Sequence, residues 1–177
     1  MNPEIVLAFN GGILRPLKSE DVHQGYIAGL NDNQVNRYLE VRHIVQTEQS
    51  VLKFICDNQQ AKNEVLFGLW RDGEQHHCGT VRLHGIEDIK RSTHIGLCIF
   101  DKSAWGYGLG SNAIACVTKW AIEDLNVRWI EAGIYEENIA SQKAFLSAGY
   151  EWISDTSGKF ILNGNSAVIK IYAKRKV

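Results

Sequence analysis

Hydrophobic and polar positions follow two different periods along this chain, and the changes of period divide it into segments. Residues 13–17 alternate as in a short strand. The acidic run after Ser19 then predicts a helix start, and this helix ends near residues 31–33. A second helix is predicted after Thr47, because a threonine suits the N-cap and an apolar stripe follows it at helical spacing (Val51, Phe54 and Ile55).

The middle of the chain is rich in predicted strands. Residues 65–71 and 78–84 flank the turn Asp72-Gly73-Glu74 and predict a hairpin, and residues 93–100 predict the next strand. From Gly110 onward the period changes to steps of three and four. This pattern predicts a helix with one apolar face, formed by Ala113, Ile114, Val117, Trp120, Ala121 and Leu125.

The last third returns to strands. Residues 127–135 predict a strand and residues 138–148 a helix that ends at Gly149. Strands at 152–155 and 167–173 are predicted on either side of a turn at residues 163–165. Helices interleaved with runs of consecutive strands indicate an α/β (α+β) fold with a mixed sheet. Neither an internal repeat nor a low-complexity linker interrupts the sequence, so we expect a single domain over residues 1–177.

Composition narrows the class of protein. Hydrophobic residues make up 45% of the 177 residues, which is enough for an ordinary core and excludes global disorder. Nineteen basic against twenty acidic residues give a net charge of −1, which argues against nucleic-acid binding through bulk charge. No apolar run approaches the ~20 residues of a membrane helix. Residues 1–14 contain neither Lys nor Arg, unlike a secretory signal, so we expect a cytoplasmic protein.

Metal and disulfide chemistry have little support in the sequence. The four cysteines include no Cys-x-x-Cys pair. The triplet His76-His77-Cys78 offers ligand types, but neighbouring residues on a strand point to opposite faces. We therefore assign no metal site.

Residues 100–112 are the most informative stretch. They join a predicted strand to an amphipathic helix, and glycines at 106, 108 and 110 let the backbone turn without obstruction from Cβ atoms. The free N–H groups at a helix start favour a phosphate or pyrophosphate. A tight turn with no ligand is the simplest alternative. A dinucleotide fingerprint needs G-x-G-x-x-G and a Walker loop needs Lys-Ser/Thr after its glycines, and this sequence has neither.

This stretch resembles the acyl-CoA pyrophosphate loop of the GNAT superfamily of N-acetyltransferases, whose motif is (Gln/Arg)-x-x-Gly-x-(Gly/Ala). Trp105, Gly108 and Gly110 occupy the matching positions. The resemblance extends over residues 13–174 and is closest to the ribosomal-protein N-terminal and spermidine acetyltransferases. Its other motifs are Leu14-Arg15-Pro16-Leu17 with Glu20-Asp21, residues 130–135, Asn138 with Ser141, and Ala148-Gly149-Tyr150.

The resemblance implies a GNAT fold: a mixed, mostly antiparallel sheet of six to seven strands with about four helices on its faces. In that family a bulge near the end of the strand before the loop splays it from its neighbour and opens a slot for acyl-CoA. The resemblance thus implies acetyl-CoA as co-substrate and no metal. The implied acyl-CoA contacts are Cys98, Ile99 and Phe100 through their main chain, the loop residues Trp105, Gly106, Tyr107, Gly108, Leu109, Gly110 and Ser111, and Asn138.

Two departures from the family pattern affect this picture. Trp105 replaces the usual Gln or Arg at the start of the loop. Phe145 replaces a Tyr that serves many members as the acid for the departing thiolate, so either Ser141 supplies the proton or no side chain does. For the base, His94 lies eleven residues before Trp105, where some members carry a catalytic Glu. An imidazole suits the removal of an amine proton near neutrality, and Glu131 is the other candidate.

The expected function is the transfer of an acetyl group from acetyl-CoA to a primary amine. The amine is a protein N-terminus, an amino sugar or another small amine, and residues 33–42 and 87–92 are expected to flank it. Because Phe145 cannot donate a proton, an acyl-CoA-binding sensor with weak or no turnover is the alternative, and an unrelated nucleotide-binding domain is a third reading. The sequence leaves the oligomeric state open, with a homodimer among the alternatives.

Overall fold

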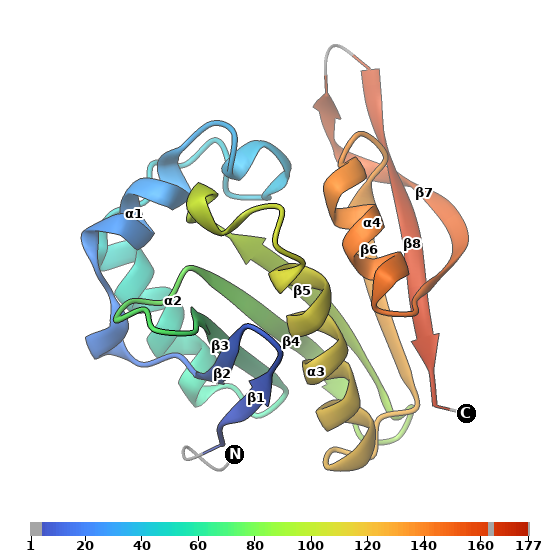
Figure 1. The fold of residues 1–177 in the computed structure, drawn as a ribbon. Coiled ribbons are helices and arrows are strands. Elements are labelled where there is room, and N and C mark those ends of the chain that lie inside the picture. Colours follow the sequence, from blue (N-terminus) through green and yellow to red (C-terminus); the bar gives the residue numbers. More distant parts are fainter. Residues whose placement is uncertain (1–4, 163–164, 177) are drawn as a thin grey trace.

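The computed structural model describes residues 5–162 and 165–176, with side chains for all of these except 159–162 and 165–166. The described strands form one eight-stranded sheet in the order β1-β2-β3-β4-β5-β6-β8-β7 (Figure 1). Neighbouring strands are antiparallel except β5 and β6, which run parallel. The bounds are β1 Leu7–Phe9, β2 Gly12–Pro16, β3 Glu64–Arg71, β4 Gly79–Glu87, β5 Ser92–Ile99, β6 Trp129–Tyr135, β7 Glu151–Leu162 and β8 Asn165–Arg175.

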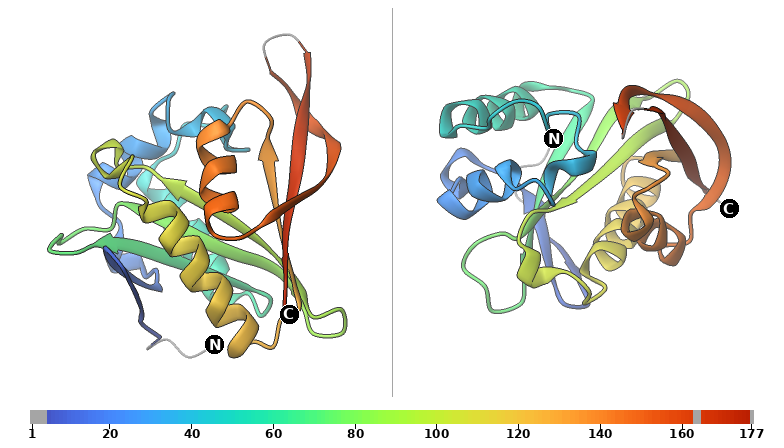
Figure 2. Two further views of the ribbon diagram at one scale, coloured as in Figure 1. Left: turned by 45° about the vertical axis from the view of Figure 1, so that its right-hand side comes forward. Right: turned by 90° about the horizontal axis from the view of Figure 1, so that it is seen from above.

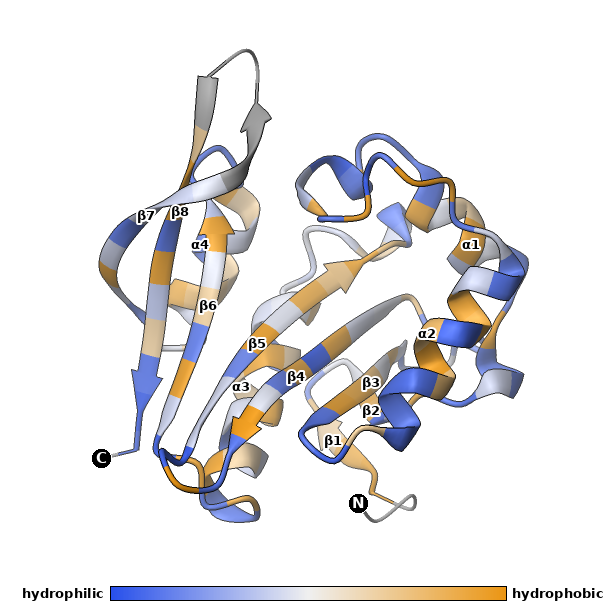
Figure 3. Cartoon of the chain, turned by 180° about the vertical axis from the view of Figure 1, so that it is seen from behind, coloured by the Kyte–Doolittle hydropathy of each residue, from blue (hydrophilic) through white to orange (hydrophobic). Residues whose placement is uncertain are grey.

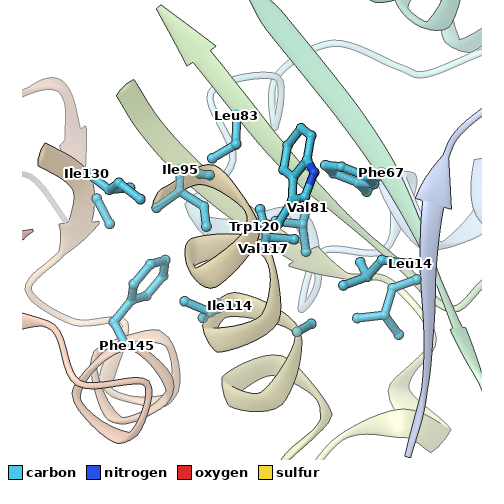
Figure 4. Packing of buried hydrophobic residues seen from close by; sticks show 14 of the residues in the cluster. Leu14, Phe67, Val81, Leu83, Ile95, Ile114, Val117, Trp120, Ile130 and Phe145 are labelled. Carbon is cyan, nitrogen blue, oxygen red and sulfur yellow. The ribbon is translucent and has the colours of Figure 1, made fainter. Parts of the chain in front are cut away.

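Four α-helices lie on the two faces of this sheet: α1 Gln24–Asn31, α2 Glu48–Gln60, α3 Leu109–Glu123 and α4 Ile139–Ser147. Helices α1 and α2 cover one face, and α3 and α4 cover the other (Figure 2). Each pair buries its own apolar cluster. The larger cluster lies under α3 and α4 and includes Phe67, Ile114 and Phe145 (Figure 4). The smaller lies under α1 and α2 around Tyr26, Ile55 and Phe100.

The predicted GNAT fold is confirmed, with one strand more than expected. Strand β1 has only three residues, too few for an alternating pattern to be read from the sequence. The helix predicted from Ser19 is a three-residue 3-10 turn followed by α1, which begins after the N-cap His23. Thr47 caps α2 as predicted, by accepting a hydrogen bond from the N–H of Ser50. Residues 163 and 164 of the predicted turn lie outside the described residues.

Strands β5 and β6 pair over three residues only, and they diverge beyond His94 and Glu131 (Figure 3). The end at which the two strands still pair is the closed end of the splay. It is held by Arg91, whose carbonyl accepts the N–H groups of Arg128 and Trp129 at 2.6 and 3.2 Å. The predicted splay is thus present. The predicted bulge near the end of β5 is wrong: the register of β4 with β5 is continuous there and shifts only between His84 and Glu87, opposite the start of β5.

Among the described residues, no helix is both long and apolar enough to cross a bilayer. No group of three or more His, Cys, Asp or Glu side chains in this part of the chain is arranged to hold a metal ion.

Candidate active site

The glycine-rich loop between β5 and α3 presents a row of free backbone donors. Gly106 and Gly108 have φ angles of 85° and 74°, which an L side chain rarely adopts. In the described part of the chain, none of the six N–H groups from Gly106 to Ser111 donates to another protein atom. A Cβ atom at Gly106 would meet nothing within 4 Å, so the space in front of this backbone is open. The loop therefore fits a phosphate-bearing ligand, held by N–H groups and the positive end of α3.

Trp105 has a structural role in this loop. Its indole N–H donates to the carbonyl of Ile99 at 2.9 Å, which ties the start of the loop to the end of β5. The ring is 42% exposed. Trp105 does not offer the polar side chain of the Gln or Arg in the family motif. Its indole instead fixes the direction in which the chain leaves β5.

Gly110 allows α3 to approach β5 closely. A Cβ atom there would stand 3.0 Å from Leu97 Cδ2 and 3.4 Å from Ile99 Cδ1. Ala144 of α4 lies on the same side, 4.0 Å from that position. The first turn of α3 is therefore held against the splayed half of β5 and next to α4.

Of the three residues predicted to contact the acyl-CoA arm through their main chain, only one faces the open edge of β5. The N–H of Phe100 donates to the Cys78 carbonyl at 3.0 Å, so it faces β4. Backbone direction alternates along a strand, so Cys98 also directs its N–H and carbonyl toward β4. Ile99 faces the opposite side, and Leu97, which the sequence analysis missed, faces the same way as Ile99. Which of these residues face the open edge can be read only from the register of β5 with β4.

Asn138 is the N-cap of α4 and keeps one polar group available. Its side-chain oxygen accepts the N–H of Ser141 at 3.2 Å. Its amide nitrogen donates to no other described residue, so it can also meet a ligand. Ser141 is half-buried in the first turn of α4, and its hydroxyl has no partner among the described residues.

Phe145 lies one turn after Ser141 and points into the core (Figure 4). It is 2% exposed and packs edge-on against Tyr150, with ring centroids 5.1 Å apart. The Tyr150 hydroxyl is bonded to Thr118 at 2.7 Å, and burial raises the pKa of this phenol well above its usual range. Tyr150 therefore does not replace the missing acid.

The two candidate bases lie side by side at the closed end of the splay. His94 and Glu131 are register partners on β5 and β6, and His94 Nδ1 is 4.0 Å from Glu131 Oε2. The side chains are 53% and 31% exposed. Thr93 and Ile95 are buried, so alternation places His94 on the opposite face, toward α1 and α2. Ile99, at the start of the glycine loop, is five residues or ~17 Å farther along β5.

The two segments expected to flank the acceptor lie in different places. The loop after α1 reaches the β6–α4 connection, where the Tyr38 hydroxyl donates to the Glu137 carbonyl at 3.0 Å. The Tyr38 ring also stacks on Tyr135 at the end of β6. Residues 87–92 instead form the turn at the closed end of the splay, against Arg128. Of the two segments, only residues 33–42 lie beside the open end of the splay.

The triplet His76-His77-Cys78 serves packing. His77 is 2% exposed and lies edge-on to Tyr26 and Phe100, with ring centroids 4.8 and 5.0 Å away. Its Nε2 is buried and has no partner among the described residues. Burial lowers the pKa of His77 to about 3, and the neighbouring His23 adds to this effect.

We expect His77 to make the fold sensitive to acid. In the unfolded chain an imidazole gains its proton below pH ~6.5, whereas the folded His77 resists it until about pH 3. The contribution of His77 to the free energy of unfolding is therefore fully present well above pH 6.5, and it falls as the pH drops from 6.5 toward 3. Linkage puts the loss between pH 7.5 and 5 at ~2 kcal/mol for this residue. Urea unfolding of His77→Phe at both pH values should show a correspondingly smaller loss, while the exposed His76→Gln should behave like the parent. Equal losses in the parent and His77→Phe would contradict this assignment.

A helix N-terminus with free donors, beside a parallel strand pair that splays open, is the arrangement of an acyl-CoA-dependent acyltransferase. The acetyltransferase (GNAT) domain family matches residues 13–151. The chain therefore belongs to the GNAT acetyltransferase family and is an acetyl-CoA-dependent acyltransferase.

Individual relatives are distant. An N-acetyltransferase of Bacillus subtilis named YoaA, itself uncharacterised, is 25% identical over 141 residues, or 78% of either chain. Among solved structures, the ribosomal L7/L12 α-N-protein acetyltransferase RimL in complex with coenzyme A is 16% identical, with a TM-score of 0.84 and coverage of 97% and 98%. Spermidine N-acetyltransferase from Vibrio cholerae, with CoA and spermine, is 18% identical, with a TM-score of 0.82 and coverage of 94% and 96%. At these identities the solved structures establish the fold alone.

Proposed function

We propose that this chain, as one catalytic domain over residues 1–177, transfers the acetyl group of acetyl-CoA to a primary amine by direct attack in a ternary complex. The six free N–H groups from Gly106 to Ser111 carry this proposal. They suit the pyrophosphate. The open edge of β5, at Leu97 and at the N–H of Ile99, suits the amide groups of the pantetheine arm, while the Ile99 carbonyl already accepts the Trp105 indole N–H. An arm extended along β5 brings the thioester toward His94 and Glu131.

The chemistry requires the acceptor nitrogen to lose two protons, one before and one after its attack, and the thiolate to gain one. The amine nitrogen attacks the thioester carbonyl, a C–N bond forms and the C–S bond breaks. The acceptor reaches the site largely as an ammonium ion, like a free Lys side chain with pKa ~10.4, and His94 takes the proton that this ion must lose before attack. The second proton leaves the nitrogen after the C–N bond has formed and passes to water. The thiolate leaves and is protonated by Ser141 or by water. It is a fair leaving group, since a thiol has a pKa of ~8.5.

The decisive experiment measures CoA release from acetyl-CoA with a panel of peptide N-termini, amino sugars and polyamines. We expect turnover with at least one class, above the rate of thioester hydrolysis. Tight acetyl-CoA binding with no turnover across the panel would instead support the sensor alternative, which Phe145 in place of the acid keeps open.

Ser141→Ala tests the origin of the thiolate proton. This change removes only a hydroxyl, and the backbone cap of α4 through Asn138 remains. If the hydroxyl is the acid, we expect kcat to fall ~10–100-fold, close to the usual range for a positioned proton donor. A fall of less than twofold would assign the proton to water.

A further inference from the structure

A row of polar side chains crosses three strands at the closed end of the splay. His84 of β4 is the register partner of His94, and His94 is the register partner of Glu131. The rings of His84 and His94 stack with centroids 5.4 Å apart and an interplanar angle of 22°. His94 therefore has a ring on one side and a carboxylate on the other. Figure 3 shows that neither α1 nor α2 lies over this part of β4 and β5.

The carboxylate in this row is held by an indole. The Trp129 N–H donates to Glu131 Oε1, two residues along the same face of β6. The other oxygen, Oε2, faces His94 Nδ1 at 4.0 Å. One oxygen is thus occupied and the other is directed at the ring. Trp129 itself is fixed because its backbone N–H donates to the Arg91 carbonyl.

From this geometry we propose that Glu131 and Trp129 are positioning residues, which hold His94 as the Nδ1–H tautomer and leave its Nε2 free to take the amine proton. The inference rests on the proposed function, in which His94 is the base. Glu131 then acts with His94 as one unit instead of competing with it for that role.

The tautomer matters because an imidazole has one donor and one acceptor nitrogen when neutral, and its partners decide which is which. A carboxylate beside Nδ1 stabilises a proton there. The 4.0 Å gap exceeds a hydrogen bond, so a small ring rotation or one bridging water completes the contact. Burial, and then the nearby Arg82 and His94, lower the pKa of the stacked His84, which disfavours a second positive charge beside His94. Arg82 is itself paired with Glu64 at 2.6 Å, and Glu40 is the other charged group near His84.

The test uses the nitrogen chemical shifts of the His94 ring, measured on the full chain at pH 8.5. We expect the parent to show mainly Nδ1–H, and Glu131→Gln and Trp129→Phe to shift the ring toward Nε2–H. Trp152→Phe is the matched control, because the Trp152 indole also donates to a carboxylate, that of Asp155, but on β7. It should leave the His94 signals unchanged.

Kinetics supply the second readout. We expect Glu131→Gln to lower kcat ~10-fold or more, and Trp129→Phe by less, with the KM for acetyl-CoA unchanged in both. The positioning role is overturned if the His94 tautomer is the same in the parent and both folded variants. If the two substitutions shift the His94 tautomer but the parent protein acetylates no amine, the positioning role stands and the proposed function is refuted. The two failures are therefore distinguishable.

Discussion

Gly108→Val should abolish useful acetyl-CoA binding. Gly108 is the residue before α3, its φ of 74° is strained for a β-branched side chain, and its N–H lies in the middle of the free row. Valine would rotate this backbone and obstruct the phosphates. Hydrogen bonds to charged groups contribute ~1.5–3 kcal/mol each, so losing two corresponds to a rise in Kd of ~10²–10⁴-fold. Calorimetric titration of acetyl-CoA measures this directly.

Gly73→Val is the matched control for that experiment. Gly73 also has a positive φ, 80°, and a Cβ there meets nothing within 4 Å. It lies in the turn between β3 and β4 and is not among the loop residues assigned to the phosphates. The two variants share the backbone strain, so both should lose comparable stability while only Gly108→Val loses affinity. Unchanged affinity in a folded Gly108→Val protein would refute the loop assignment.

His94→Gln should lower turnover by ~10²-fold or more, because a positioned base commonly contributes 10²–10⁴-fold. Glutamine keeps the approximate size and hydrogen bonding but does not titrate. The affinity for acetyl-CoA should stay nearly intact, since the glycine loop lies at the far end of β5. The acidic limb of the rate profile, which reports loss of the free base, should disappear.

His76→Gln is the control for this substitution, because it removes an exposed histidine from the turn between β3 and β4. It should keep both the rate and the acidic limb. If His94→Gln also keeps them, His94 is an ordinary strand residue, and Glu131 or water takes the role of base.

Local patterns were sufficient for much of the fold. The period of α3, the caps at Thr47 and Asn138 and the hairpin of β3 and β4 depend on neighbouring residues, so they could be predicted from the chain alone. The family resemblance added the arrangement of the sheet and its splay. Three features differ from expectation. The three residues of β1 were missed because they are too few to show a pattern, and the helix signal at Ser19 produced only a 3-10 turn. The bulge on β5 was implied by the family resemblance and is absent there.

For the candidate site, the sequence supplied the residue assignments and the structure supplied their arrangement in space. The residues assigned to it remain predictions, but their spatial relations come from the structure. No local pattern indicates that Trp129, Glu131 and His94 meet, because β5 and β6 are separated by the whole of α3. The direction of the β5 backbone, toward β4 at Phe100 and away from it at Ile99, depends on strand register, which is a long-range property.

The glycine loop before an amphipathic helix could be recognised from the amino-acid order alone, and with it the resemblance to the family and the expected co-substrate. These features are encoded by residues close together in the chain, where the backbone freedom of glycine and helix periodicity act directly. The folded chain was needed to show that Phe145 faces the core and that His77 is buried with no partner for Nε2 among the described residues. It was also needed to show that His94 lies between His84 and Glu131. The physical reason is that burial and cross-strand contacts arise when distant segments pack together, and that packing is set by the whole chain at once.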